Sequence, residues 1–219
     1  MVLKQRNTNL DALKGIAAIL IVFIHVRIGE GRTGQYVSDI ARFGVPVFFL
    51  TSGYFVSDAS RKKLKHSIFH VFRYIVVAYV LNLVRLFVEN HCSFSLTVQA
   101  IAKICTRKHL VYWLVMNTTT LSGVSWFLWT LLYCYCIHLL LYEAVSNNRL
   151  LFILASVGFC IGLTAQLLFP MVIGKTLGTN NVWMCGLPFY ATGLLINRYR
   201  TEIRNRFSNE QFVMMQHLA

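Results

Sequence analysis

Two ionisable residues near the N-terminus, Lys14 and His25, have a spacing that could support chemistry. Eleven residues at about 100° each bring both side chains to within roughly 20° of one helix face, about 16 Å apart along the axis. An imidazole inside an apolar segment can act as a general base near neutral pH, and a cation on the same face could hold an anionic substrate end. Alternatively, His25 is a polar residue satisfied against a neighbouring helix, and spacing alone leaves both readings open.

A second group of candidate residues lies in the segment RFGVPVFFLTSGY, residues 42–54. Its Gly and Ser residues permit close approach of helices in a membrane, and Pro46 would free backbone carbonyl groups. Arg42 offers a fixed guanidinium fork for a carboxylate, a phosphate or a polar substrate. Taken singly, each of these features also suits plain helix packing.

A third group is the basic segment RKKLK at residues 61–65, in which Lys62, Lys63 and Lys65 could contact phosphate groups. The alternative is an ordinary signal for orientation in a membrane, since cytoplasmic loops carry an excess of Lys and Arg.

The composition indicates a membrane protein. Of 219 residues, 56% are hydrophobic and 13% are charged, and the mean hydropathy is +0.57. That is more apolar surface than one soluble core can bury. The net charge of +13 does not indicate a nucleic-acid partner, because Lys and Arg stand between apolar runs and form no continuous basic stripe. With three prolines and no repeat, residues 1–219 are predicted to form one domain.

The apolar runs predict an all-α transmembrane bundle of about six spans, since crossing the hydrocarbon core takes about 20 residues. Two runs lack Asp, Glu, Lys and Arg throughout, at 123–142 and 150–174. The other expected spans are 15–26, 43–57, 67–88 and 181–197. The first two of these are short enough to be re-entrant, and the first could also be a signal-peptide core, although no small-residue cleavage site follows it.

The basic residues orient the bundle with its N-terminus in the cytoplasm. Six spans place residues 61–65 and a basic tail at 199–219 on the cytoplasmic face. The basic stretch 103–108 then falls outside, where we expect an amphipathic helix on the membrane surface. The six cysteines lack paired ligand spacing, so no metal site is predicted.

The first two segments carry a family resemblance. DALKGIAA at residues 11–18, followed by His25, resembles the opening signature of the acyltransferase-3 family of membrane O-acyltransferases, and residues 42–54 resemble its second-span signature. Weaker similarities are SWFL at 125–128 and GLPF at 186–189. Members of this family usually have more spans and a longer chain, so the domain is expected to be incomplete: a fragment, a split half that pairs with a second chain, or an inactive remnant.

The resemblance implies transfer of an acyl group, commonly acetyl from acetyl-CoA, to a hydroxyl of a cell-envelope glycan or lipid-linked sugar. His25 would be the catalytic residue, as a base or as an acyl carrier, and no acidic partner can be assigned to it. Lys14, Arg42, Ser52 and Trp126 would bind substrate.

For the donor, Lys62, Lys63 and Lys65 would contact the acyl-CoA phosphates. We expect a multi-pass protein of the cell membrane, in a bacterium the cytoplasmic membrane. No bound cofactor is expected. A rival hypothesis is a transporter or flippase that uses Lys14 and Arg42 only as binding charges, although the paired broken helices typical of transporters are not seen.

Overall fold

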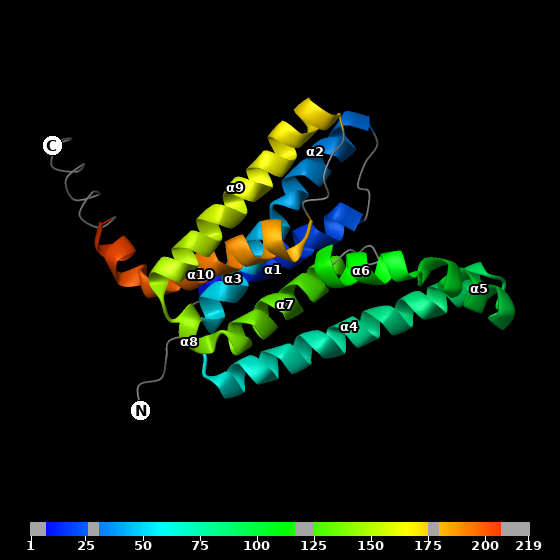
Figure 1. The fold of residues 1–219 in the computed structure, drawn as a ribbon, viewed down its shortest axis with the longest axis horizontal. Helices are drawn as coiled ribbons and strands as arrows, with labels where there is room; N and C mark the ends of the chain where they lie inside the picture. Colours follow the sequence, from blue (N-terminus) through cyan, green and yellow to red (C-terminus); the bar gives the residue numbers. More distant parts are fainter. Residues whose placement is uncertain (1–7, 26–30, 117–124, 175–179, 207–219) are drawn as a thin grey trace.

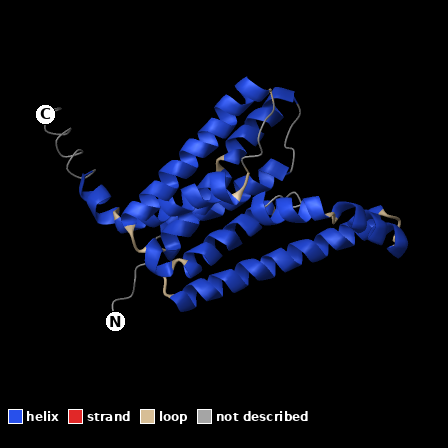
Figure 2. Cartoon of the chain, viewed as in Figure 1, coloured by secondary structure: helices blue, strands red, loops and turns tan. Residues whose placement is uncertain are grey.

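The computed structural model describes residues 8–25, 31–116, 125–174 and 180–206, and this part of the chain is helical throughout, with no strand (Figure 2). In chain order the elements are α1 (Thr8–His25), α2 (Gly31–Arg42), α3 (Gly44–Val56), α4 (Arg61–Glu89), α5 (Phe94–Ile104), α6 (Arg107–Met116), α7 (Trp126–Leu140), α8 (Tyr142–Val145), α9 (Asn148–Ile173), the π-helical turn η1 (Val182–Gly186) and α10 (Leu187–Arg198). The prediction of an all-α fold is confirmed.

Two of the described helices, α4 and α9, are long and apolar enough to cross a membrane. The side chain of Ser60 caps α4 by accepting a hydrogen bond from the Lys63 amide, and Asn147 caps α9 in the same way. Gly174 ends α9 in the left-handed conformation, at φ 67°. Large apolar side chains such as Leu81 and Phe152 are about two-thirds exposed, at 64% and 65%, which favours lipid as their solvent.

The other predicted spans are shorter helices, so six full crossings are not established by length. The run 43–57 forms α3, with 13 residues, and 123–142 contains α7, with 15 residues. The run 181–197 is divided between η1 and α10. The stretch 103–108 is not the single amphipathic helix we expected: α5 ends at Ile104 and α6 begins at Arg107, so its charges flank a break. Of the predicted tail 199–219, Tyr199 is in a turn, residues 200–206 are helical, and residues 207–219 lie outside the described residues.

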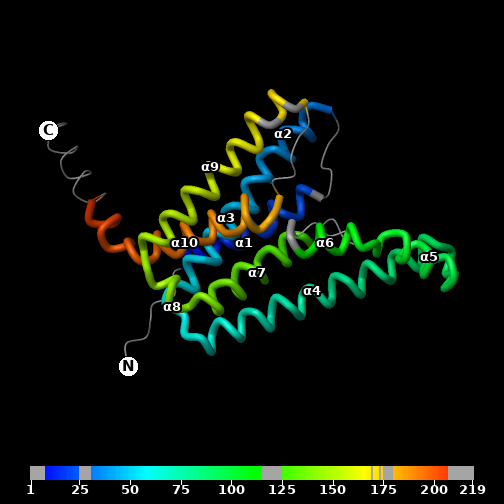
Figure 3. The backbone as a smooth tube through the Cα atoms, in the orientation of Figure 1, coloured from blue at the N-terminus to red at the C-terminus, as the bar shows by residue number. Residues whose placement is uncertain are grey.

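Consecutive long segments alternate in direction, as the ribbon and the tube both show (Figures 1 and 3). Hydrogen bonds join the segments at one end of the bundle: the Tyr142 hydroxyl donates to the Ala59 carbonyl at 3.1 Å, and the Arg198 guanidinium donates to the Ser146 carbonyl at 3.3 Å. We call this the basic end, because it carries Arg61, Lys62, Lys63, Lys65, Arg149, Arg198, Arg200, Arg204 and Arg206.

The central helix is α3, which packs against α1 on one side and crosses α10 on the other. Glycines make the crossing possible. A Cβ added at Gly53 would collide with the Tyr190 carbonyl oxygen, and one added at Gly193 would collide with the Leu50 carbonyl oxygen. Helices in membranes approach closely through such small residues. On the α1 side, a Cβ at Gly44 would lie 2.8 Å from the Ala17 carbonyl oxygen.

Candidate active site between α1, α3 and α7

Lys14 lies at the interface of α1 and α3, with its ammonium group over two aromatic rings. Its Nζ atom is 5.0 Å from the ring centroid of Phe48 and 5.7 Å from that of Phe55. Both distances are within the range of cation–π attraction. The side chain is half-buried, and the charge of Asp11, three residues earlier on α1, acts on it favourably. The interface therefore shields this cation in part from bulk water.

His25 is the last residue of α1, so Lys14 and His25 belong to one helix, as their spacing requires. Ala17 and Ile21 are buried on α1, and the helical register places position 25 within about 40° of Ile21. The side chain of His25 lies outside the described residues. The backbone thus confirms the predicted helix and leaves the orientation of the imidazole as a prediction.

Phe127 of α7, which the sequence analysis did not single out, packs against the Phe48 ring that Lys14 contacts. The ring of Phe127 meets that of Phe48 edge to face, with centroids 5.0 Å apart. Its neighbour Trp126, a predicted substrate contact, is half-buried at the start of α7 and packs against the core. A signal for Phe127 was present, since it is part of the SWFL match, but that match does not say which aromatic residue faces α3.

Arg42 and Ser52 differ from the half-buried Lys14 in their exposure to solvent. Arg42 ends α2 with its side chain 73% exposed, and forms a 4.0 Å ion pair with Asp39. Ser52 is fully buried. Its Oγ atom has no hydrogen bond of good geometry to any described residue, although the Tyr135 hydroxyl is close enough to interact with it. A direct substrate contact by Ser52 would require α3 and α7 to separate.

A buried polar pair joins α7 to α10 next to Ser52. The Nδ1 atom of His138 and the hydroxyl of Tyr190 share a hydrogen bond of 2.7 Å, and both residues are buried. The ring of Tyr135 packs against that of Tyr190, at 5.8 Å between centroids. Sequence reasoning missed this pair, although a histidine in the charge-free run 123–142 was a signal for it, because polar groups in apolar spans need partners.

The predicted donor contacts Lys62, Lys63 and Lys65 are exposed on the first two turns of α4, at the basic end. Their neighbour Arg61 forms an ion pair instead: its guanidinium lies 2.7 Å from a Glu143 carboxylate oxygen and over the ring of Tyr142. The three lysines are exposed and remain accessible to an anion at the basic end.

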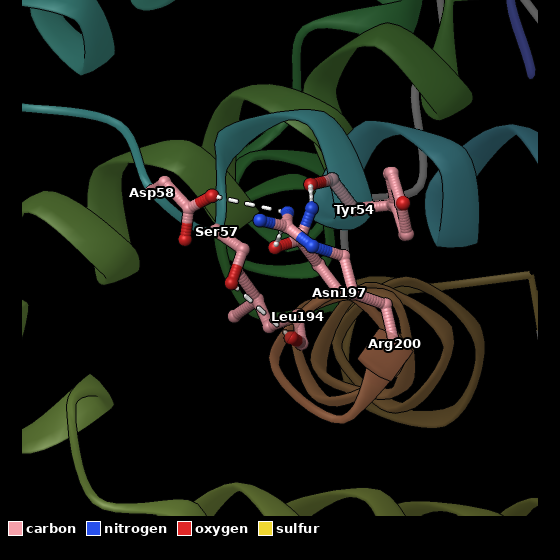
Figure 4. Close-up of polar contacts among 6 residues, drawn as sticks. All are labelled: Tyr54, Ser57, Asp58, Leu194, Asn197 and Arg200. Atoms are coloured by element: carbon pink, nitrogen blue, oxygen red, sulfur yellow. Dashed lines mark hydrogen bonds and ion pairs between the residues drawn. The ribbon is translucent and has the colours of Figure 1, made fainter. Parts of the chain in front are cut away.

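The adjacent junction of α3 and α10 is held by side chains rather than open to a ligand (Figure 4). The Asn197 amide donates to the Tyr54 carbonyl at 3.0 Å and accepts from the Arg200 guanidinium at 3.1 Å. Arg200 also pairs with Asp58 at 3.4 Å. The Ser57 hydroxyl donates to the Leu194 carbonyl at 3.2 Å. These contacts fix the C-terminal end of α3.

The family model described as an acyltransferase domain matches residues 7–215, which include every described helix. The chain belongs to the acyltransferase-3 family. No curated protein and no solved structure gives a significant match. Membership agrees with the two helices able to cross a membrane, because the family is membrane-associated. The matched range covers both α1, which carries Lys14 and His25, and α3.

Proposed function

We propose that this acyltransferase-3 protein moves an acyl group, most simply acetyl, from acyl-CoA to a hydroxyl of a cell-envelope glycan or lipid-linked sugar. Family membership supports the reaction class. One observation supports the assignment of the site. Lys14 lies on α1, the helix that ends at His25, and its ammonium group contacts the rings of Phe48 and Phe55 on α3. A cation held in this way, on the helix that bears a candidate base, suits a substrate with an anionic end.

In the proposed reaction, the neutral imidazole of His25 takes the proton of the acceptor hydroxyl while the hydroxyl oxygen attacks the thioester carbonyl carbon. The carbon–sulfur bond breaks, and the departing thiolate takes the proton from the imidazolium. A route in which the imidazole itself is acylated first gives the same products and uses the same residue.

We propose that the donor approaches from the basic end, where Lys62, Lys63 and Lys65 are exposed to meet its phosphates. The alternating directions of the long segments support a six-span bundle. The basic residues gathered at this end favour placing it in the cytoplasm. Arg42, exposed at the end of α2, and Trp126 remain proposed acceptor contacts. In this arrangement the donor and the acceptor reach the site from opposite sides of the membrane.

The test compares His25→Ala and Lys14→Met with a matched control, His109→Ala, in membranes given radiolabelled acetyl-CoA. His109 lies on α6 and its ring bonds Thr106, away from α1. Removing a general base is expected to lower incorporation into glycan by roughly 10²- to 10⁴-fold. Lys14→Met keeps the side-chain stem, so we expect a higher KM for substrate with a smaller change in kcat. Labelling by His25→Ala equal to the control, at equal expression, would remove His25 from the reaction.

A further inference from the structure

A groove of about 700 Å³ lies between the N-terminal part of α9 and the C-terminal part of α10, at the basic end. Its volume is in the range of roughly 300–1,000 Å³ that is usual for small-molecule sites. The lining residues are Asn148, Arg149, Phe152, Ile153, Leu195, Ile196, Tyr199 and Ile203. None of them is acidic.

The groove is on a different face of α10 from the candidate active site. Leu194 and Asn197 of α10 bond to α3, through Ser57 and the Tyr54 carbonyl. Leu195, Ile196 and Tyr199 point to the groove instead. Because α10 lies between the groove and α3, a ligand in the groove does not touch the helix that holds Lys14.

The groove has an apolar floor and a cationic mouth. Phe152, Ile153, Ile196 and Ile203 supply the floor, and Phe152 and Ile153 are more than half exposed. At the mouth, the Asn148 amide donates to the Tyr199 hydroxyl at 3.1 Å, which joins the two helices.

Arg149 is the cation of that mouth. It is exposed, and within the described ranges its guanidinium has no hydrogen bond or ion pair. Arg198 is close by, since its guanidinium donates to the Asn148 side-chain oxygen at 2.7 Å. The amino end of α9, a 26-residue helix, adds positive potential at the same place. An anion at this mouth would meet the Arg149 guanidinium and the positive potential of the helix terminus, with the charge of Arg198 nearby.

We propose that this groove binds an anionic phospholipid, with an acyl chain along the apolar floor and the phosphate at Arg149. The groove opens beside α9, one of the two helices able to cross a membrane, at the end where its basic residues meet the interface. An uncharged lipid would leave Arg149 unused, and a free phosphate would leave the apolar floor exposed to water. Only an anionic amphiphile satisfies both parts, and this inference does not depend on the acyl-transfer reaction.

The experiment titrates the detergent-solubilised protein with phosphatidylglycerol or with phosphatidylcholine of the same chains, and counts retained lipids by native mass spectrometry. The unchanged protein should retain phosphatidylglycerol preferentially. Arg149→Gln should weaken its retention roughly fivefold, the effect of about one interfacial basic residue. Retention of phosphatidylcholine should fall less, because the choline cation offsets the charge of its phosphate. Ile196→Trp fills the groove and should reduce retention of both lipids.

Arg107→Gln is the matched control, because Arg107 is an exposed arginine at the start of α6, away from α9 and α10. The inference is overturned if Arg149→Gln behaves like Arg107→Gln, or if the unchanged protein shows no preference between the two lipids. A dimer that retains no lipid, and that Ile196→Trp dissociates, would also overturn it by assigning the groove to a second copy of the chain. Acyl transfer is measured separately, so either proposal can fail alone.

Discussion

Replacing Gly53 by Ala should destabilise the bundle, because α3 and α10 leave no room for a methyl group. The added Cβ would overlap the Tyr190 carbonyl oxygen and lie 3.0 Å from the Tyr190 carbonyl carbon. These are backbone atoms of another helix, so the helices must move apart. Overpacking of this kind costs about 1–3 kcal/mol. For a chain of this length each kcal/mol shifts Tm by roughly 2–4 °C, which predicts a decrease of about 2–12 °C.

Gly15→Ala is the matched control, since a Cβ at Gly15 of α1 would meet nothing within 4 Å. There the gain in helix propensity should dominate, stabilising the protein by about 0.4–1 kcal/mol and raising Tm. Thermal unfolding in detergent, followed by far-ultraviolet circular dichroism, measures both variants. If the two substitutions shift Tm in the same direction and by similar amounts, the close crossing of α3 and α10 is wrong.

Two other perturbations test the contacts that join distant helices. Tyr190→Phe leaves the buried His138 ring nitrogen without its partner, which should cost about 1–3 kcal/mol and lower Tm, with secondary structure unchanged before the transition. Asn197→Ala should cost a similar amount, because the Tyr54 carbonyl loses its side-chain donor. Arg200→Gln removes a half-exposed ion pair with Asp58 and a hydrogen bond to Asn197, and should cost less than about 1 kcal/mol. A larger loss for Arg200→Gln than for Asn197→Ala in the same melts would contradict this ranking.

Local patterns were sufficient for several features. The helical period places Lys14 and His25 on one helix, and α1 is continuous between them. The charge-free run 150–174 forms most of α9, and the residues that cap this helix, Asn147 and Gly174, are of types common at helix ends. The motif at residues 42–54 indicated the family, which the match over residues 7–215 confirms. Each of these depends on residues close together in the sequence.

Other features were decided only by tertiary structure. The sequence did not indicate that Ser52 is buried next to Tyr135, or that the Phe127 ring packs against the Phe48 ring. Nor did it show that the basic stretch 103–108 spans a break between two helices. Sequence reasoning ranked residues by chemical type, whereas their accessibility depends on what packs over them.

The sequence by itself determined that this chain is helical, apolar and basic at one end, because periodicity and composition are local properties. Tertiary structure decided which glycines are crossing points. Gly15 and Gly53 look alike in the sequence, yet one is open and the other touches the backbone of Tyr190. A helical stripe defines a face but not its partner. One partner of α3, the helix α10, lies more than a hundred residues away in the sequence, and only close packing selects it.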